Sequence, residues 1–237
     1  MTDERRTAIA ANLLHIKEGI RQAAARSGRA PEDVRLVAVS KNFPLEDVAR
    51  AMEAGQTLFG ENRVQELLPK MEGAEKMDLA CEWHMIGTLQ RNKVRFLAGK
   101  VSLIHSVNSL GLLSTIDRLA GDRGLVQDVL LQVNVSGEES KQGFSPSELP
   151  AILEAARKFG HVRLCGLMTM APFYDDPEEA RRDFSELREL RDRTVAREGL
   201  PSFTELSMGM TNDYLQAVEE GATLVRIGSA IFGSRIF

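Results

Sequence analysis

Short apolar segments alternate with amphipathic segments along almost the whole chain, and this alternation constrains the fold more than any other feature. Strand candidates lie at 35–40, 57–60, 83–87, 102–107, 129–135, 162–168, 204–207 and 223–227. Helix candidates lie at 5–27, 45–54, 62–71, 90–98, 109–120, 146–159, 177–198 and 212–220. Runs such as 36–39 are continuously apolar, which is typical of parallel strands covered on both faces. We therefore predict a (β/α)₈ TIM barrel preceded by an N-terminal helix, with a doubly wound open sheet as the alternative.

The size and composition of the chain favour one soluble barrel. Its 237 residues match the size of such a barrel and no change in composition marks a boundary, so we predict a single domain over residues 1–237. The formal net charge is −4 without a basic run, which argues against a nucleic-acid interface. The N-terminus lacks the apolar core of a signal peptide, and no apolar run approaches the roughly 18 residues of a membrane helix. The two cysteines are far apart and match no metal spacing, so we expect free thiols in a cytoplasmic protein.

Lys41 follows the first strand candidate, and this position makes it a candidate reactive group. The carboxyl ends of the strands form the face where barrels of this type keep their active sites. In a partly dry pocket the ammonium form is disfavoured, and the free amine can form a Schiff base with an aldehyde or ketone. The alternative is a solvated lysine that happens to follow a strand.

Polar residues also follow the second and third strand candidates. Asn62 stands at the start of the helix candidate 62–71, where it can cap the helix, contact a ligand, or do both. His84 lies within an apolar strand candidate, so we expect a hydrogen-bonded core histidine. His105 falls on the neighbouring strand and can approach it, but no carboxylate accompanies the pair at ligand spacing. We therefore predict no catalytic metal site.

The segments after the last two strand candidates predict a phosphate site. Phosphate sites in these barrels often lie after strands seven and eight, near a helix N-terminus. Ser207 and Ser229 supply hydroxyl groups there, while Gly209 and Gly228 let backbone N–H groups approach an anion closely. The alternative is that these small residues simply form tight turns.

Arg226 is the unusual residue of the last strand candidate. A buried arginine cannot lose its charge, so it needs a core carboxylate or a ligand as partner. A reactive amine after strand one, a phosphate cradle after strands seven and eight, and this cation together suit an aldehyde that carries a phosphate.

The same segments resemble the pyridoxal 5′-phosphate (PLP) homeostasis proteins, also called PLP-binding proteins. The similarity spans nearly the whole chain, in order, through AVSK at 38–41, FGENRVQE at 59–66, WHMIGTLQRNK at 83–93, QVNV at 132–135, GLM at 166–168, LSMGM at 206–210 and VRIGSAIFG at 225–233. Family members often continue the lysine motif with Thr-Lys-Pro, where this chain has Asn42, Phe43 and Pro44. Asn108 stands where an aspartate is common.

The resemblance implies a fold similar to the barrel domain of alanine racemase, and a site for one cofactor. It implies that PLP is bound covalently to Lys41 as an internal aldimine. It further implies phosphate contacts from Ser207, Gly228 and Ser229, Arg226 facing the pyridine nitrogen, and Asn62 near the cofactor. A cation at the ring nitrogen would disfavour protonation of that nitrogen and weaken the ring as an electron sink.

Three functions are compatible with such a site. The first is a monomeric, non-catalytic carrier in vitamin B6 homeostasis that holds PLP and passes it to apo-forms of PLP-dependent enzymes, with no catalytic residues. The second is an amino-acid racemase, which usually needs acid–base groups on both faces of the substrate. The sequence ends just after strand eight, so we expect no C-terminal domain to supply the opposing tyrosine, although Tyr174 and Tyr214 can approach the mouth. The third is a cofactor-free aldolase that uses Lys41. The resemblance favours the carrier.

Overall fold

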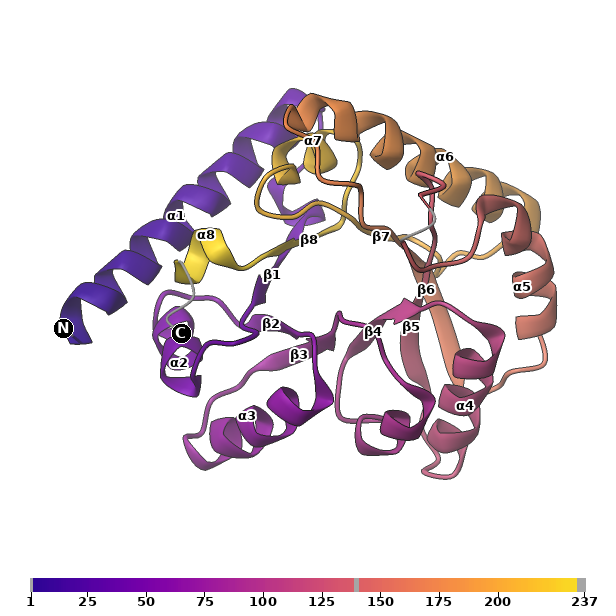
Figure 1. Ribbon diagram of the computed structural model, residues 1–237, viewed down its shortest axis with the longest axis horizontal. Helices are drawn as coiled ribbons and strands as arrows, with labels where there is room; N and C mark the ends of the chain where they lie inside the picture. Colours follow the sequence, from indigo (N-terminus) through magenta and orange to yellow (C-terminus); the bar gives the residue numbers. More distant parts are fainter. Residues whose placement is uncertain (1, 139–140, 234–237) are drawn as a thin grey trace.

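The computed structural model describes residues 2–138 and 141–233 and contains a closed parallel barrel (Figure 1). The strands are β1 (Arg35–Val39), β2 (Leu58–Glu61), β3 (Glu82–Met85), β4 (Leu103–Val107), β5 (Gln127–Gln132), β6 (Val162–Met168), β7 (Glu205–Ser207) and β8 (Leu224–Ile227). Each strand pairs with its neighbours in chain order, and β8 closes the barrel by pairing with β1. The predicted barrel is therefore confirmed, and the open sheet is excluded.

The helices form an outer ring around the strands. They are α1 (Thr2–Arg26), α2 (Leu45–Glu53), α3 (Val64–Lys76), α4 (Leu110–Gly121), α5 (Leu149–Ala156), α6 (Arg181–Glu198), α7 (Tyr214–Glu219) and α8 (Ser229–Phe232). The helix expected over 90–98 is only a 3₁₀ segment, Arg91–Phe96, and α8 was not predicted. Segments this short contain too few turns for an apolar period to identify them. Within the described residues, no helix has both the length and the apolar character needed to cross a bilayer.

Two separate apolar clusters give the strands their burial on both faces. The larger cluster joins the strands to the surrounding helices. The smaller cluster fills the barrel interior with side chains such as Val37, Leu58, Leu103 and Leu130. Because successive side chains of a strand point to opposite faces, the residues that alternate with those of the larger cluster face the interior. The fifth strand ends at Gln132 rather than 135, and Val133 forms an isolated bridge with Phe144 in a later loop.

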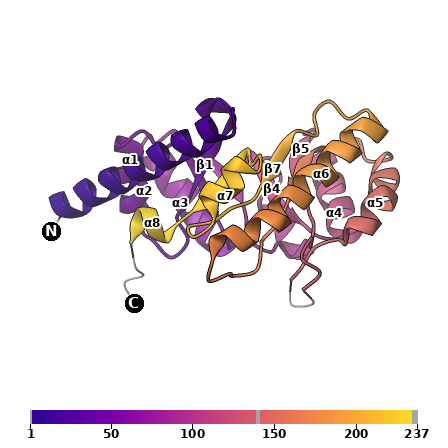
Figure 2. The same ribbon diagram turned by 90° about the horizontal axis from the view of Figure 1, so that it is seen from above.

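The N-terminal helix α1 fills the place in the outer ring that the short α8 leaves open. Figures 1 and 2 show α1 running beside α7 and α8 and meeting α2. Asn12 Nδ2 donates to the Ile231 carbonyl oxygen at 2.9 Å, and Arg5 donates to the Phe232 carbonyl oxygen at 3.1 Å. Arg5 also pairs with the buried carboxylate of Asp47 in α2. Helix α1 thereby holds in place the segment that follows β8.

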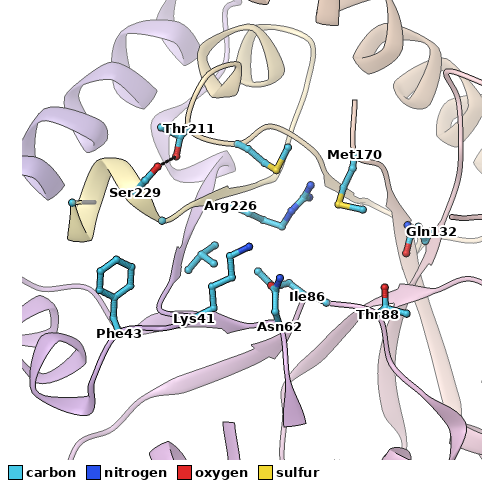
Figure 3. A pocket seen from close by; sticks show the side chains of 15 residues that line it. Lys41, Phe43, Asn62, Ile86, Thr88, Gln132, Met170, Thr211, Arg226 and Ser229 are labelled. Atoms are coloured by element: carbon cyan, nitrogen blue, oxygen red, sulfur yellow. Dashed lines mark hydrogen bonds between the residues drawn. The ribbon is translucent and has the colours of Figure 1, made fainter. Parts of the chain in front are cut away.

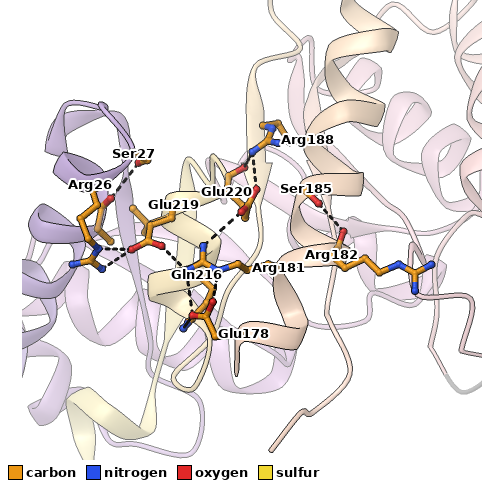
Figure 4. A network of polar contacts seen from close by, with 12 residues as sticks. Arg26, Ser27, Glu178, Arg181, Arg182, Ser185, Arg188, Gln216, Glu219 and Glu220 are labelled. Atoms are coloured by element: carbon orange, nitrogen blue, oxygen red, sulfur yellow. Dashed lines mark hydrogen bonds and ion pairs between the residues drawn. The ribbon is translucent and has the colours of Figure 1, made fainter. Parts of the chain in front are cut away.

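An ion-pair network on the outer surface links α1, α6 and α7 (Figure 4). Glu219 of α7 accepts from Arg26 at 2.6 Å and from Arg181 at 2.5 Å. Its neighbour Glu220 pairs with Arg188 at 2.8 Å, and Glu178 pairs with Arg181 at 2.6 Å. We call these six residues the surface network.

Candidate functional site

A cavity of about 340 Å³ lies at the carboxyl ends of the strands (Figure 3). It is lined by Val39, Lys41, Phe43, Asn62, Ile86, Gly87, Thr88, Gln132, Met170, Met210, Thr211, Arg226, Gly228, Ser229 and Gly233. Five of the six residues predicted from the sequence therefore share one cavity, namely Lys41, Asn62, Arg226, Gly228 and Ser229. Ser207 lies nearby but is fully buried.

The turn after β1 directs Lys41 into this cavity. Its side chain points toward the same space as Arg226 and lies beside Asn62 (Figure 3). Asn42 adopts a left-handed backbone conformation with φ of 65°, which asparagine tolerates better than most residues. The Asn42 backbone N–H donates to Glu66 Oε2 at 3.0 Å, so a contact to α3 holds the turn immediately after the lysine.

A buried ion pair holds the residue before Lys41. Ser40 Oγ donates to Glu61 Oε1 at 2.7 Å, and Lys70 Nζ donates to the same carboxylate and to the Ser40 carbonyl oxygen. Burial raises the pKa of Glu61, while the charge and hydrogen bond of Lys70 act to lower it. Ser40 is thus fixed through its side chain and its backbone, and the start of the lysine turn is rigid.

Asn62 lines the cavity and does not cap α3. The N-terminal capping position of that helix is Arg63, so the cap interpretation of Asn62 is wrong. Asn62 instead packs closely against Gly87, where an added Cβ would lie 2.3 Å from the Asn62 carbonyl oxygen. Glycine at position 87 therefore allows the two loops to meet at the cavity wall.

Arg226 is buried and has uncharged hydrogen-bond partners. It donates to Ser207 Oγ at 2.5 Å and to the Thr169 carbonyl oxygen at 2.9 Å. Burial lowers the pKa of Arg226 to about 10, although the charge of Asp213 acts in the opposite direction. The guanidinium group therefore remains protonated at neutral pH, and it presents a positive charge to the cavity.

Two hydroxyl groups meet on the side of the cavity formed after β7 and β8. Thr211 Oγ1 and Ser229 Oγ lie 3.3 Å apart (Figure 3). Next to them, a Cβ on Gly228 would lie 3.1 Å from the Val39 carbonyl oxygen, so glycine permits the close approach of β8 to β1. Sequence reasoning did not single out Thr211, although its position shortly after the seventh strand is the signal that identified Ser207.

Ser207 lies in the barrel interior below the cavity. Its hydroxyl group contacts His105 Nδ1 at 2.8 Å as well as Arg226. The phosphate contact expected for Ser207 stays a prediction. Gln132 and Thr88 also line the cavity without having been predicted as site residues. Each is a polar residue at or just after the end of a strand, and each lies within a motif of the family resemblance, QVNV at 132–135 and WHMIGTLQRNK at 83–93.

The fold and the cavity define a barrel of the alanine racemase type, with an amine, a cation and hydroxyl groups at its mouth. The family model for the alanine racemase N-terminal domain matches residues 11–236. An alanine racemase from Clostridium difficile superposes with a TM-score of 0.75 over 98% of this chain and 59% of that chain, at 14% identity, which shows a shared fold.

Closer relatives narrow the class to one family. A pyridoxal phosphate homeostasis protein from Aquifex aeolicus is 44% identical over 94% of this chain and 96% of its own length. One from Pseudomonas aeruginosa is 44% identical over 96% of each chain. The structure of PipY from Synechococcus elongatus with PLP bound has a TM-score of 0.82 and 36% identity, over 95% of this chain and all of that chain. The chain belongs to the pyridoxal phosphate homeostasis protein family, as the sequence motifs predicted.

Proposed function

We propose that this protein binds PLP in the cavity at the mouth of the barrel, with a covalent bond to Lys41, and holds the cofactor without catalytic turnover. The observation that carries the proposal is the convergence of Lys41, Arg226 and Ser229 on one cavity. Membership of the PLP homeostasis family and the PLP bound to PipY support it. The proposal includes a monomeric, cytoplasmic, single-domain protein that supplies PLP to apo-forms of PLP-dependent enzymes.

The residues present fit the chemical groups of PLP. A cavity of about 340 Å³ is within the range of small-molecule sites. The Lys41 amine would condense with the aldehyde, forming a C=N bond and releasing one water molecule. The hydroxyl groups of Ser229 and Thr211 and the backbone at Gly228 would hold the phosphate, with Ser207 as a further predicted contact. Arg226 would face the ring nitrogen, and Asn62 would lie near the ring. PLP, when bound, supplies an aldehyde that takes up amines and a ring that withdraws electrons.

The two tyrosines favour a carrier over a racemase. Tyr174 lines a neighbouring hollow, where its hydroxyl donates to Asp183 Oδ2 at 3.1 Å. Tyr214 packs against α1. A Cβ added to Gly19 of that helix would lie 2.6 Å from the Tyr214 hydroxyl oxygen. Both hydroxyl groups therefore have surroundings outside the Lys41 cavity, and neither tyrosine lines that cavity as the second acid–base group of a racemase would.

A PLP titration of wild type and Lys41→Ala tests the binding site. We expect the wild-type protein to gain a visible absorption band that borohydride bleaches, with a PLP-sized mass increase on the peptide containing Lys41. Lys41→Ala should lose the bleachable band while keeping weaker, reversible binding through the phosphate contacts. Wild-type protein that takes up no PLP would refute the proposal and leave the aldolase as the surviving alternative.

Incubation of the loaded protein with L- and D-amino acids then tests the carrier role, which sustained racemisation or product formation would overturn.

Ser229→Asp tests the phosphate contacts separately. A carboxylate beside a dianionic phosphate should weaken PLP binding by roughly a hundredfold, because two like charges meet in a partly buried site. Ser185→Asp is the matched control, since Ser185 lies half-buried on α6 and does not line the cavity. Equal affinity for PLP in the two variants, measured by fluorescence titration, would contradict the placement of the phosphate.

A further inference from the structure

A row of polar side chains crosses the interior of the barrel beneath the cavity. Glu82 Oε1 lies 3.1 Å from His84 Nε2, and His84 Nδ1 lies 2.9 Å from His105 Nε2. His105 Nδ1 lies 2.8 Å from Ser207 Oγ, which accepts from Arg226. The row thus connects the start of β3, at the opposite face of the barrel, with the cation of the cavity. We call these five residues the interior chain.

The direction of every hydrogen bond in the interior chain follows from its two ends. An arginine can only donate, and an ionised carboxylate can only accept. Ser207 Oγ therefore accepts from Arg226, so its single hydrogen is available to His105 Nδ1. His105 then carries its proton on Nε2 and donates to His84 Nδ1. His84 likewise carries its proton on Nε2 and donates to Glu82.

The surroundings of the two histidines favour this arrangement. Burial, aided for His105 by the charge of Arg226, holds the pKa of both imidazoles below the usual range, so both are neutral at pH 7.5. The hydrogen bond from His84 lowers the pKa of Glu82, which keeps that carboxylate ionised. Each neutral imidazole has one donor and one acceptor nitrogen, and in the interior chain both nitrogens of both rings are in contact.

We infer that His84 and His105 are positioning residues that act through Ser207 to fix Arg226 at the floor of the cavity. With its hydrogen directed to His105, the Ser207 oxygen offers a lone pair to the guanidinium group. The Thr169 carbonyl oxygen supplies the second acceptor, so the guanidinium plane has two fixed contacts and cannot rotate freely. In this inference Ser207 acts on the ligand through Arg226. The alternative is the direct phosphate contact that the sequence predicts for Ser207. The effect of the interior chain on PLP binding rests on the proposed function. The hydrogen-bond directions are independent of it.

The hydrogen-bond directions in the interior chain are tested on the ligand-free protein. Long-range ¹H–¹⁵N correlation spectra of ¹⁵N-histidine-labelled protein report the tautomer of each ring. The chain has four histidines, and the variants His15→Gln and His161→Gln assign the two that lie elsewhere. We expect neutral Nε2–H tautomers for His84 and His105 at pH 7.5. An Nδ1–H tautomer or a charged ring at either position overturns the inference, whether or not the protein binds PLP.

The effect on the site is tested with His105→Phe and Ser207→Ala, with His161→Gln as the control at an exposed histidine. We expect both variants to weaken PLP binding about tenfold and to move the absorption band of the bound cofactor in the same direction, while the double variant adds little. The control should match wild type. A change in Ser207→Ala without one in His105→Phe would mean that Ser207 acts directly on the phosphate, and would overturn the inference.

If wild type itself took up no PLP, the proposed function would fail while the tautomer experiment would still decide the hydrogen-bond directions. If the variants did not fold, those wild-type spectra would decide the inference.

Discussion

The interior chain and the surface network both join charged groups across several elements, but they differ in burial and in the kind of partner. In the interior chain, Arg226 and His105 are buried, and neutral groups separate the cation from the carboxylate of Glu82. In the surface network each charge meets an opposite charge directly, and Arg26 is 54% exposed. Water can replace a lost partner on the surface, whereas His84, His105, Ser207 and Arg226 are buried from solvent.

The loss of stability on removing one partner differs in size between the two regions. An exposed ion pair contributes about 0–1 kcal/mol, because solvent screens the charges and the side chains lose entropy on pairing. A buried donor or acceptor left without a partner costs about 1–3 kcal/mol. The surface network therefore contributes little to the free energy of unfolding, whereas each buried member of the interior chain, namely His84, His105, Ser207 and Arg226, is sensitive to the loss of a partner.

The largest expected effect is that of His105→Ala on the free energy of unfolding. The change leaves a cavity in the barrel interior and removes the partner of both His84 and Ser207. We expect a loss of about 3 kcal/mol, measured by urea unfolding at pH 7.5. A loss below 1 kcal/mol would place the interior chain in the same class as the surface network.

Mild acid should have a smaller effect on the free energy of unfolding. Of the two regions, the interior chain should respond at the higher pH. The pKa of His105 is lowered in the folded protein, so the unfolded chain binds a proton there that the native protein does not. The stability linked to this histidine is complete above the unfolded pKa of about 6.5 and is lost as the pH falls. We expect the free energy of unfolding to fall by about 1 kcal/mol between pH 8 and pH 5.5, and less in His105→Phe.

The surface network should respond to acid only at lower pH. The hydrogen bonds from Arg181 and Gln216 lower the pKa of Glu178 to about 2. Its contribution is therefore present above about pH 4.5 and is lost as the pH falls toward 2. Unfolding curves of wild type and Glu178→Gln should converge in that range, and a difference that already disappears at pH 6 would contradict this assignment.

The smallest effect is expected for Glu219→Gln, which weakens two contacts of the surface network. We expect a loss of less than about 1 kcal/mol at low salt that shrinks further at 0.5 M NaCl, because salt screens exposed pairs. The effect of His105→Ala should be the same at both salt concentrations, since its origin is cavity formation and lost hydrogen bonds in the interior. Equal salt dependence of the two variants would remove the distinction between the regions.

Much of the site was predictable because it lies where strands end. Lys41, Gly228 and Ser229 each follow an apolar run, and the carboxyl ends of parallel strands meet at one face. Thr211, Gln132 and Thr88 were missed, because a single polar residue after a strand is equally common in ordinary turns. Asn62 was assigned two possible roles, and the observed start of α3 at Val64 removed one of them.

The sequence by itself determined the order of the strands and of the longer helices, the barrel class, and several residues at its mouth, among them Lys41 and Ser229, since apolar runs and strand-end positions are local properties of the chain. Only the tertiary structure decided that His84, His105, Ser207 and Arg226 form one connected row, and that α1 occupies the place left open by α8. Those contacts join residues far apart in the chain, so they depend on strand register and closure of the barrel. A local sequence pattern specifies neither the strand register nor the closure of the barrel.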